Sequence, residues 1–268
     1  MASSTISRLQ VEEFLAEKPP FDRLSQDTIK SSVVGKCQLL GYKTGQPLFE
    51  RDKMPTQITI IYEGQARVLG YDQRTQRNAS LQVVGPGAIL GWLGLIRGLP
   101  CETAIASTEL IAITLAAEDF LALVAAEPAF GEAFTDNASP IEVFELLGGE
   151  FARRADVSAN IKEFAKLLWE ETVVVNLQNG SRKESELASA LDAEKVWLVS
   201  SGVVGDHPTG SRLALENSNK PINIEGPRGA RLIGFPEKSS FTVAEETAPE
   251  TTPETSNGNG NGQLAVEG

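Results

Sequence analysis

Hydrophobic and polar positions in the first half of the chain alternate in short runs that turn residues separate. The β-branched run Gln57–Tyr62 and the apolar run Glu109–Leu115 are typical of strands. The polar stretch Asp72–Asn78 lies between the runs Gln65–Tyr71 and Ala79–Val84, which predicts a hairpin. Short strands with turns about every ten residues favour a β-sandwich or jelly roll over a sheet of parallel strands.

Helical patterns flank these strands. Residues 1–18 predict a short helix or leader, which Pro19-Pro20 ends because the residue before a proline is pushed out of the helical region. A second short helix is expected from Phe21 to about Lys36, with Ser25 as its N-cap.

The apolar period becomes helical again at Ala116, and Pro128 should end or kink that helix. A second helical stretch is expected over residues 141–171, with an interruption near Gly148-Gly149. It contains apolar residues at the i, i+3, i+4 and i+7 spacing of one helix face. These are Ile161, Phe164, Ala165 and Leu168.

The chain returns to strand patterns after residue 171. Val173–Leu177, Val196–Ser200 and Arg231–Phe235 predict a small β region without a strong core of its own. Glu, Thr, Pro, Asn and Gly dominate the end of the chain, which predicts a disordered acidic tail. The expected organisation is a leader at 1–18, a jelly roll at 19–145, a helical segment at 146–171, the small β region at 172–241 and the tail at 242–268.

Charge argues against nucleic acid as a partner. The chain has 36 acidic and 24 basic residues, for a formal net charge of −12. Five of the acidic residues lie in the tail, so the rest of the chain is only modestly acidic. A protein that binds nucleic acid or an anionic membrane would require a cationic face.

Cysteine and histidine are scarce, which argues against a zinc site, a disulfide framework and catalysis. The chain has one histidine, His207, and two isolated cysteines, Cys37 and Cys101. A Ser-His-Asp arrangement would depend on His207, which lies in a turn-rich stretch. No run approaches the ~20 apolar residues of a membrane span. We therefore expect a non-enzymatic, cytoplasmic protein with no metal and no membrane insertion.

A glycine-rich segment carries the candidate ligand site. Gly85–Leu95 places a glycine turn before an apolar half-turn, and Pro100–Ser107 follows with small residues. Such a loop can aim backbone N–H groups at an anion. It can equally be a barrel corner, where glycine allows a sharp bend.

Residues 21–145 resemble the cyclic nucleotide-binding domain family, whose jelly roll is flanked by helices. Its phosphate cassette reads roughly F-G-E-L-A-L and then R-S/T-A, with the Glu on the ribose 2′-hydroxyl and the Arg on the cyclic phosphate. In this chain, Trp92 stands where that Glu is expected and Glu102 where that Arg is expected. The resemblance implies a degenerate pocket at Leu90, Gly91, Trp92, Leu93, Glu102, Thr103 and Ala104.

These two departures disfavour cyclic AMP or cyclic GMP as a ligand, because Glu102 replaces a phosphate-binding fork with a like charge. Three interpretations stay open. Trp92 can plug the cavity while Glu102 is a surface residue paired with Arg97. The pocket can instead take a cationic or neutral ligand against Trp92. Residual cyclic-nucleotide binding is the third. No cofactor is expected.

A narrower resemblance concerns context. The stretches 51–55, 62–71 and 97–104 are similar to the N-terminal regulatory region of cyanobacterial peptidase-containing ABC exporters, and 196–202 and 231–234 to the β segment that follows it. This implies a regulatory or scaffold protein with a protein partner, either a transporter component or a second copy.

Other partners and roles remain open. The helical stretch 141–169 could form a homodimer or pack on its own barrel. A small-molecule sensor and a catabolite-activator-like regulator are the alternative functions. For the latter, Arg182–Ala188 faintly resembles the first helix of a helix-turn-helix, but Asp192–Val199 turns strand-like after it.

Overall fold

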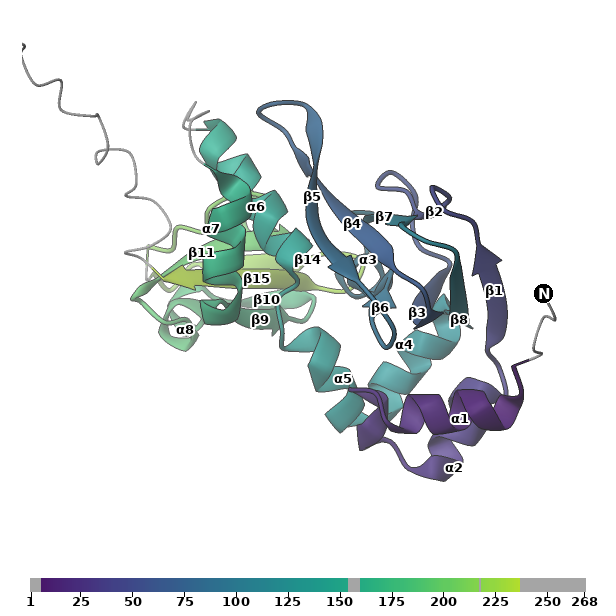
Figure 1. The fold of residues 1–268 in the computed structure, drawn as a ribbon. Helices are drawn as coiled ribbons and strands as arrows, with labels where there is room; N and C mark the ends of the chain where they lie inside the picture. The colour runs from purple at the N-terminus through teal and green to yellow at the C-terminus, as the bar shows by residue number, and fades with distance from the viewer. Residues whose placement is uncertain (1–5, 154–159, 217, 237–268) are drawn as a thin grey trace, which may run out of the picture.

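The computed structural model describes residues 6–153, 160–216 and 218–236. Two four-stranded antiparallel sheets form a jelly roll, in the orders β1-β8-β3-β6 and β2-β7-β4-β5 (Figure 1). The strands are β1 (Gln38–Tyr42), β2 (Pro47–Phe49), β3 (Gln57–Glu63), β4 (Ala66–Asp72), β5 (Arg77–Val84), β6 (Ile89–Leu90), β7 (Thr103–Ala106) and β8 (Leu110–Ala116). The jelly roll is thus confirmed. The predicted tail at 242–268 and the first five residues of the leader lie outside the described residues.

Apolar residues of the predicted strands are buried in the sheets of the jelly roll. In β3, Ile58, Ile60 and Ile61 are all fully buried, because the strand lies inside its sheet between β8 and β6. The predicted hairpin is confirmed, since β4 and β5 pair antiparallel from Ala66 with Val84 to Asp72 with Arg77. The polar tip therefore lies at the turn, and the apolar positions of β4 face the core.

The N-terminal helical segments differ in part from prediction. The leader contains α1 (Arg8–Ala16), and Ser25 caps the next helix, because its hydroxyl accepts from the Thr28 N–H at 3.1 Å. The expected single helix from Phe21 to about Lys36 is wrong. It is divided into η1 (Phe21–Arg23), α2 (Gln26–Thr28) and the π-helical η2 (Ile29–Val34). The reason is local, since Leu24 and Ser25 are both extended.

Helices gather at one end of the jelly roll (Figure 1). α4 (Ala117–Ala126) follows β8, and Pro128 begins α5 (Pro128–Thr135) rather than only ending α4. Proline suits the first helical position, where its missing N–H would have no partner. Aromatic rings join these helices, with Phe130 5.2 Å from Phe21 and 5.1 Å from Phe134 between centroids.

The helix α6 (Pro140–Arg153) runs without a break through Gly148-Gly149, so the predicted interruption there is wrong. Gly148 is buried, and the methyl end of Ile161 lies 3.7 Å from where its Cβ would be. That distance is ordinary van der Waals contact with α7 (Ile161–Leu168), so neither a bend nor close packing requires glycine at this position. The predicted boundary between residues 145 and 146 falls inside α6, and the division into domains stays a prediction.

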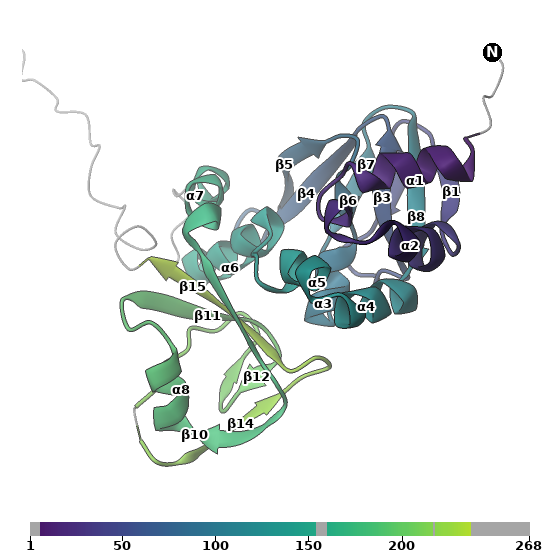
Figure 2. The same cartoon turned by 90° about the horizontal axis from the view of Figure 1, so that it is seen from below.

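The C-terminal β region lies across α5 and α6 from the jelly roll (Figure 2). Two sheets build it, in the orders β11-β15-β9 and β10-β14-β12-β13. The elements after α7 are η3 (Trp169–Glu171), β9 (Val173–Leu177), β10 (Gly180–Lys183), α8 (Glu184–Ala190), β11 (Lys195–Ser201), β12 (Val203–Val204), β13 (His207–Pro208), β14 (Pro221–Glu225) and β15 (Ala230–Pro236).

This region has its own hydrophobic core, which corrects the expectation of a weak one. The buried side chains come from strands of both sheets, from α8 with the residue that follows it, and from the loop before β14. They are Leu177, Leu187, Leu191, Trp197, Val199, Val204, Leu213, Ile222, Ile224, Ala230 and Leu232. The three strands predicted here are confirmed as β9, β11 and β15. Within the described ranges, no helix has the length and apolar character needed to cross a membrane.

Candidate functional site

The predicted cassette forms a strand, a short helix and a strand around one glycine. Leu90 ends β6, Gly91 precedes α3 (Trp92–Arg97), and Thr103 and Ala104 begin β7. Leu90, Leu93 and Ala104 are buried in the jelly-roll core, while Trp92 and Thr103 are half-buried. The structure therefore places all seven predicted residues in one continuous feature.

Gly91 is the sharp turn of this feature. Its φ of 83° lies in the left-handed region, and a Cβ there would come within 2.6 Å of the Phe49 ring. Both the backbone and the close approach therefore require glycine.

Replacing Gly91 by Ala should lower the free energy of unfolding by about 2–4 kcal/mol, because strain at a positive φ adds to the overlap with Phe49. Urea denaturation checks the value. The control is Gly45→Ala, where φ is 84° but no atom lies within 4 Å of the added Cβ. It should cost only the backbone strain, about 1–2 kcal/mol. Equal losses at the two glycines would contradict the role of the Phe49 contact.

Glu102 is the acidic group of the site. Its side chain is buried, with the residue 6% exposed, and its Oε2 accepts the Gly91 N–H at 2.9 Å. Burial raises the pKa of Glu102 to about 7, although the Gly91 hydrogen bond opposes the shift. The interpretation of Glu102 as a surface residue paired with Arg97 is wrong, because both side chains are buried and Arg97 pairs elsewhere.

Trp92 lies between two parts of the core. Its ring packs on Phe134 of α5 with centroids 5.4 Å apart in an edge-to-face arrangement, and it contacts the buried clusters on both sides of the cassette. The indole thus joins the jelly roll to the helices at its end. This placement supports the interpretation that Trp92 fills space as a packing residue.

Arg97 ends the cassette helix and is 3% exposed. Its guanidinium donates to Glu145 of α6 at 3.0 Å and to the Ser200 carbonyl of β11 at 2.7 Å. It therefore links the cassette to two later parts of the chain.

Glu142 and Arg231 form a buried pair that was not among the predicted site residues. Glu142 lies in α6 and Arg231 in β15, and Arg231 Nε donates to Glu142 Oε1 at 2.8 Å. A signal was available, because each is a charged residue within an otherwise apolar buried stretch. Charged side chains are rarely fully buried unless they are paired.

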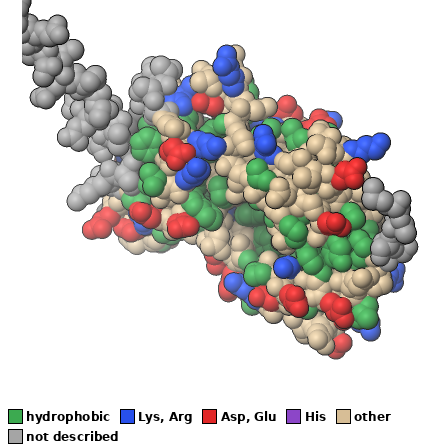
Figure 3. Space-filling view, in the orientation of Figure 1, with side chains coloured by type: hydrophobic (Ala, Val, Ile, Leu, Met, Phe, Trp, Pro, Cys, Tyr) green, Lys and Arg blue, Asp and Glu red, His purple; other side chains and the backbone are tan. Residues whose placement is uncertain are grey.

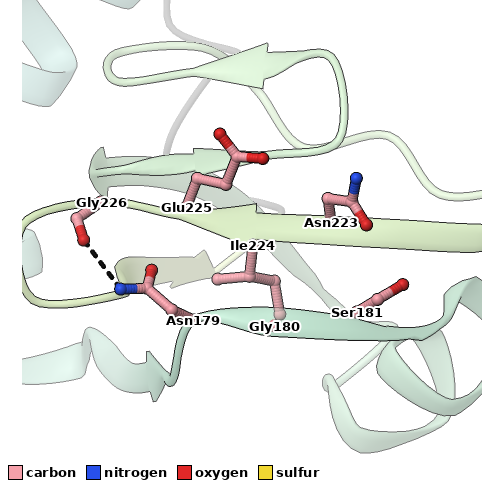
Figure 4. A pocket seen from close by; sticks show the side chains of 7 residues that line it. All are labelled: Asn179, Gly180, Ser181, Asn223, Ile224, Glu225 and Gly226. Carbon is pink, nitrogen blue, oxygen red and sulfur yellow. Dashed lines mark hydrogen bonds between the residues drawn. The ribbon is translucent and has the colours of Figure 1, made fainter.

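The cavities of the chain lie around and beyond the cassette. One of about 520 Å³ is lined by Glu50, Arg51, Asp52, Tyr71, Asn78 and the cassette residue Thr103. Arg51 lies over the Tyr71 ring at 4.3 Å from its centroid. A second, of about 450 Å³, lies over β10 and β14 in the C-terminal β region (Figure 4). There the Asn179 amide donates to the Gly226 carbonyl at 2.9 Å and closes one end of the cavity.

His207 and Cys101, the groups considered for catalysis, lie apart in the sequence and have different surroundings. His207 contacts the Ala214 carbonyl at 3.0 Å, far along the chain from the cassette. Cys101 is buried, as expected for a small core residue, and burial raises the pKa of its thiol. Among the described residues, no group of three His, Cys, Asp or Glu side chains is arranged to hold a metal ion.

The surfaces bear on the predicted partners. On the face in Figure 3, acidic and basic side chains are interspersed, and no basic patch forms there. The apolar side of α6 is buried within the chain, against β4 and β11. Of the two roles considered for this helix, the packing agrees with the one in which it packs on its own barrel. The homodimer through 141–169 stays a prediction. After α8, the chain continues into the strand β11, not into a second helix.

Comparisons with known proteins address the jelly roll. Residues 39–127 match the family model described as the cyclic nucleotide-binding domain. The cAMP-bound PfPKA-R structure is 14% identical, with 89% of this chain and 84% of that chain covered and a TM-score of 0.41. The catabolite activator protein of Thermus thermophilus is 20% identical, covers 53% of this chain and 61% of its own length, and has a TM-score of 0.37.

The sensor domain of the transcriptional regulator DNR from Pseudomonas aeruginosa is 12% identical, with 53% of this chain and 91% of that domain covered and a TM-score of 0.40. No curated protein sequence matches this chain. The family match covers β1 to α4, the segment that contains the cassette. Residues 39–127 therefore match the cyclic nucleotide-binding domain, and the chain has the β-rich, cyclic nucleotide-binding-like jelly roll that this match implies.

Proposed function

We propose that this protein is a non-enzymatic regulatory or scaffold protein whose cyclic nucleotide-binding-like domain does not bind cyclic AMP or cyclic GMP in the manner of the family. The observation that carries the proposal is the hydrogen bond from the Gly91 N–H to the buried Glu102 carboxylate. The protein's own acidic group uses this backbone donor of the cassette, so a ligand anion would have to displace it.

Electrostatics opposes that displacement. A phosphate charge about 4 Å from an ionised Glu102 would be repelled by about 4 kcal/mol at an effective dielectric constant near 20. Because the pKa of Glu102 is about 7, protonation of Glu102 relieves this repulsion for less than about 1 kcal/mol near neutral pH, so the repulsion weakens binding by no more than about fivefold and the missing phosphate fork is the larger loss. Trp92 adds to this effect, because an indole cannot accept the ribose hydroxyl proton.

Calorimetric titration of the full chain with cyclic AMP and with cyclic GMP tests the proposal. We expect no saturable binding up to about 1 mM of either nucleotide, because the repulsion and the missing phosphate fork act together. The double variant Trp92→Glu and Glu102→Arg restores the family residues and should bind with micromolar affinity. Circular dichroism of the variant establishes that it is folded.

The wild-type titration decides the proposal by itself. Micromolar binding of either nucleotide to the unaltered chain would overturn it, whatever the double variant does. The matched control for the Glu102→Arg part is Glu109→Arg, which makes the charge change of that single substitution at an exposed position near the start of β8. This control should leave the chain unable to bind either nucleotide.

A second candidate function, sensing of another small molecule, is favoured by the cavity at Thr103. Arg51, Tyr71 and Asn78 give this cavity a cation, an aromatic face and an amide at the edge of the cassette. Such a mixture suits a small polar ligand rather than an apolar one. A thermal-shift screen with polar metabolites, and with Arg51→Met as control, separates this function from a purely structural scaffold.

The proposed partner is another protein, either a component of an export system or a second copy. The export association is supported by the sequence resemblance at 51–55, 62–71 and 97–104. Light scattering of the full chain tests the second copy, since a strict monomer would remove it.

A further inference from the structure

A chain of buried charges runs from the cassette helix to the C-terminal β region. Its first member is Arg97 at the end of α3, whose guanidinium donates to Glu145 and to the Ser200 carbonyl. Ser200 lies in β11, so this contact spans from the jelly roll to the second β region. The residue after α3 also lies against the second β region, because a Cβ on Gly98 would lie 2.9 Å from Pro227, in the turn between β14 and β15.

Glu142 is the middle member and has no exposed surface. One of its oxygens lies 2.8 Å from Arg231 Nε and 4.0 Å from Arg97 Nε. The same oxygen accepts the Ser200 hydroxyl. Glu142 therefore hydrogen-bonds to Arg231 and to β11, and it lies at ion-pair distance from Arg97, whose buried Nε has no hydrogen-bond partner among the described residues.

Arg231 of β15 is the last member, and it holds the junction between α5 and α6. It donates to the Thr135 carbonyl at 2.5 Å and to the Asn137 carbonyl at 2.8 Å, both at that junction. It also donates to Asn176 of β9 at 3.2 Å. One side chain thus fixes the α5–α6 junction, the start of α6 and the sheet of the C-terminal β region.

We propose that the C-terminal β region holds the cassette helix α3 and the α5–α6 junction in one arrangement through Arg97, Glu142 and Arg231, so that a change in either part of the molecule is transmitted to the other. A buried ion pair cannot be stretched gradually, because a separated partner is left as an uncompensated charge. The network therefore favours discrete arrangements, as coupling between sites requires.

This inference rests on the proposed function, because it assigns control of the arrangement of the cassette to the C-terminal β region instead of to a bound nucleotide. The contacts themselves do not depend on whether a nucleotide binds. A partner that binds the C-terminal β region would affect the cassette through the contacts of α6.

Hydrogen exchange of the full chain tests the coupling in both directions. Arg231→Lys keeps the charge but loses the fork that reaches Thr135 and Asn137. We expect at least tenfold faster exchange of α3 amides in this variant, although within the described residues Arg231 makes no hydrogen bond or ion pair to α3 and reaches it only through Glu142. Arg97→Lys should likewise speed exchange in β15 at least tenfold. Arg182→Lys, in β10 and outside the network, should change neither.

The outcomes separate coupling from local packing. Faster exchange confined to the α5–α6 junction for Arg231→Lys, or to α3 for Arg97→Lys, would overturn the proposal. A double-mutant cycle of Arg97→Lys and Arg231→Lys gives a second measure. If the two arginines are coupled, the change in the unfolding equilibrium constant of the double variant should differ by at least about threefold from the product of the two single changes. If faster exchange stays local in both variants and the wild-type chain binds no nucleotide, the coupling is rejected but the proposed function is not.

Discussion

Replacing Glu142 by Ala should lower the free energy of unfolding by about 3–5 kcal/mol, a large share of the stability of an ordinary domain. Glu142 is fully buried, and its loss would leave Arg231 without its carboxylate and Arg97 with Glu145 alone. Burial by itself would raise the pKa of Glu142, but Arg231 and Arg97 hold it below its usual value. The carboxylate is therefore ionised when folded, and it compensates the buried guanidinium groups.

Urea denaturation at neutral pH measures this loss, with Glu132→Ala as the matched control. Glu132 is an exposed carboxylate of the neighbouring helix α5, so its replacement should change stability by no more than about 0.5 kcal/mol. Glu142→Gln should fall between the two, because the amide keeps one acceptor but not the charge. A loss below about 1 kcal/mol for Glu142→Ala would show that the two arginines do not depend on this carboxylate.

The strands were predictable because their signals are local. Val173–Leu177 is β9 with the predicted bounds, since a β-branched run between turn residues has few other stable arrangements. The cassette was recognised differently: the local pattern around Gly91 predicted only a glycine turn and an apolar half-turn, and the resemblance to a known family assigned those residues to a cassette, where the structure has the helix α3. The helix from Phe21 failed at Leu24 and Ser25, where an N-cap residue has to be extended.

Side-chain partners were not predictable in the same way. Arg97 and Glu102 are five residues apart, and proximity along the chain suggested an ion pair. Gly98, at a φ of 69°, reverses the backbone between them, so that Arg97 points to α6 and β11 and Glu102 points back to Gly91. Such a choice depends on elements more than forty residues away in sequence, which no local pattern encodes.

The same argument explains why the buried charges were missed. Glu142 lies in a helix whose apolar pattern predicted packing but not the partner, and Arg231 lies in a strand that was predicted correctly. Each charge is stable in the core only because the other is there, from 89 residues away. The pattern of apolar residues thus gives the layers of this fold, and pairs of buried polar residues determine how those layers are joined.

Raising the pH from 4.5 to about 7.5 should lower the free energy of unfolding of the wild-type protein by about 3 kcal/mol more than that of Glu102→Gln. The pKa of Glu102 rises from an ordinary 4.5 to about 7 on folding, chiefly because burial disfavours its charge. Between these values the folded chain keeps a proton that the unfolded chain releases, so stability falls as pH rises. The shift of about 2.5 units corresponds to about 3 kcal/mol, fully present as stability below pH 4.5 and lost as pH passes 7.

Urea denaturation across this range, compared between wild type and Glu102→Gln, isolates the contribution, because the other titrating groups are common to both proteins. Glu109→Gln removes an exposed carboxylate just before β8 and should leave a curve parallel to wild type. Parallel curves for wild type and Glu102→Gln would instead show that folding does not raise the pKa of Glu102, which would contradict the dominance of burial over the Gly91 hydrogen bond.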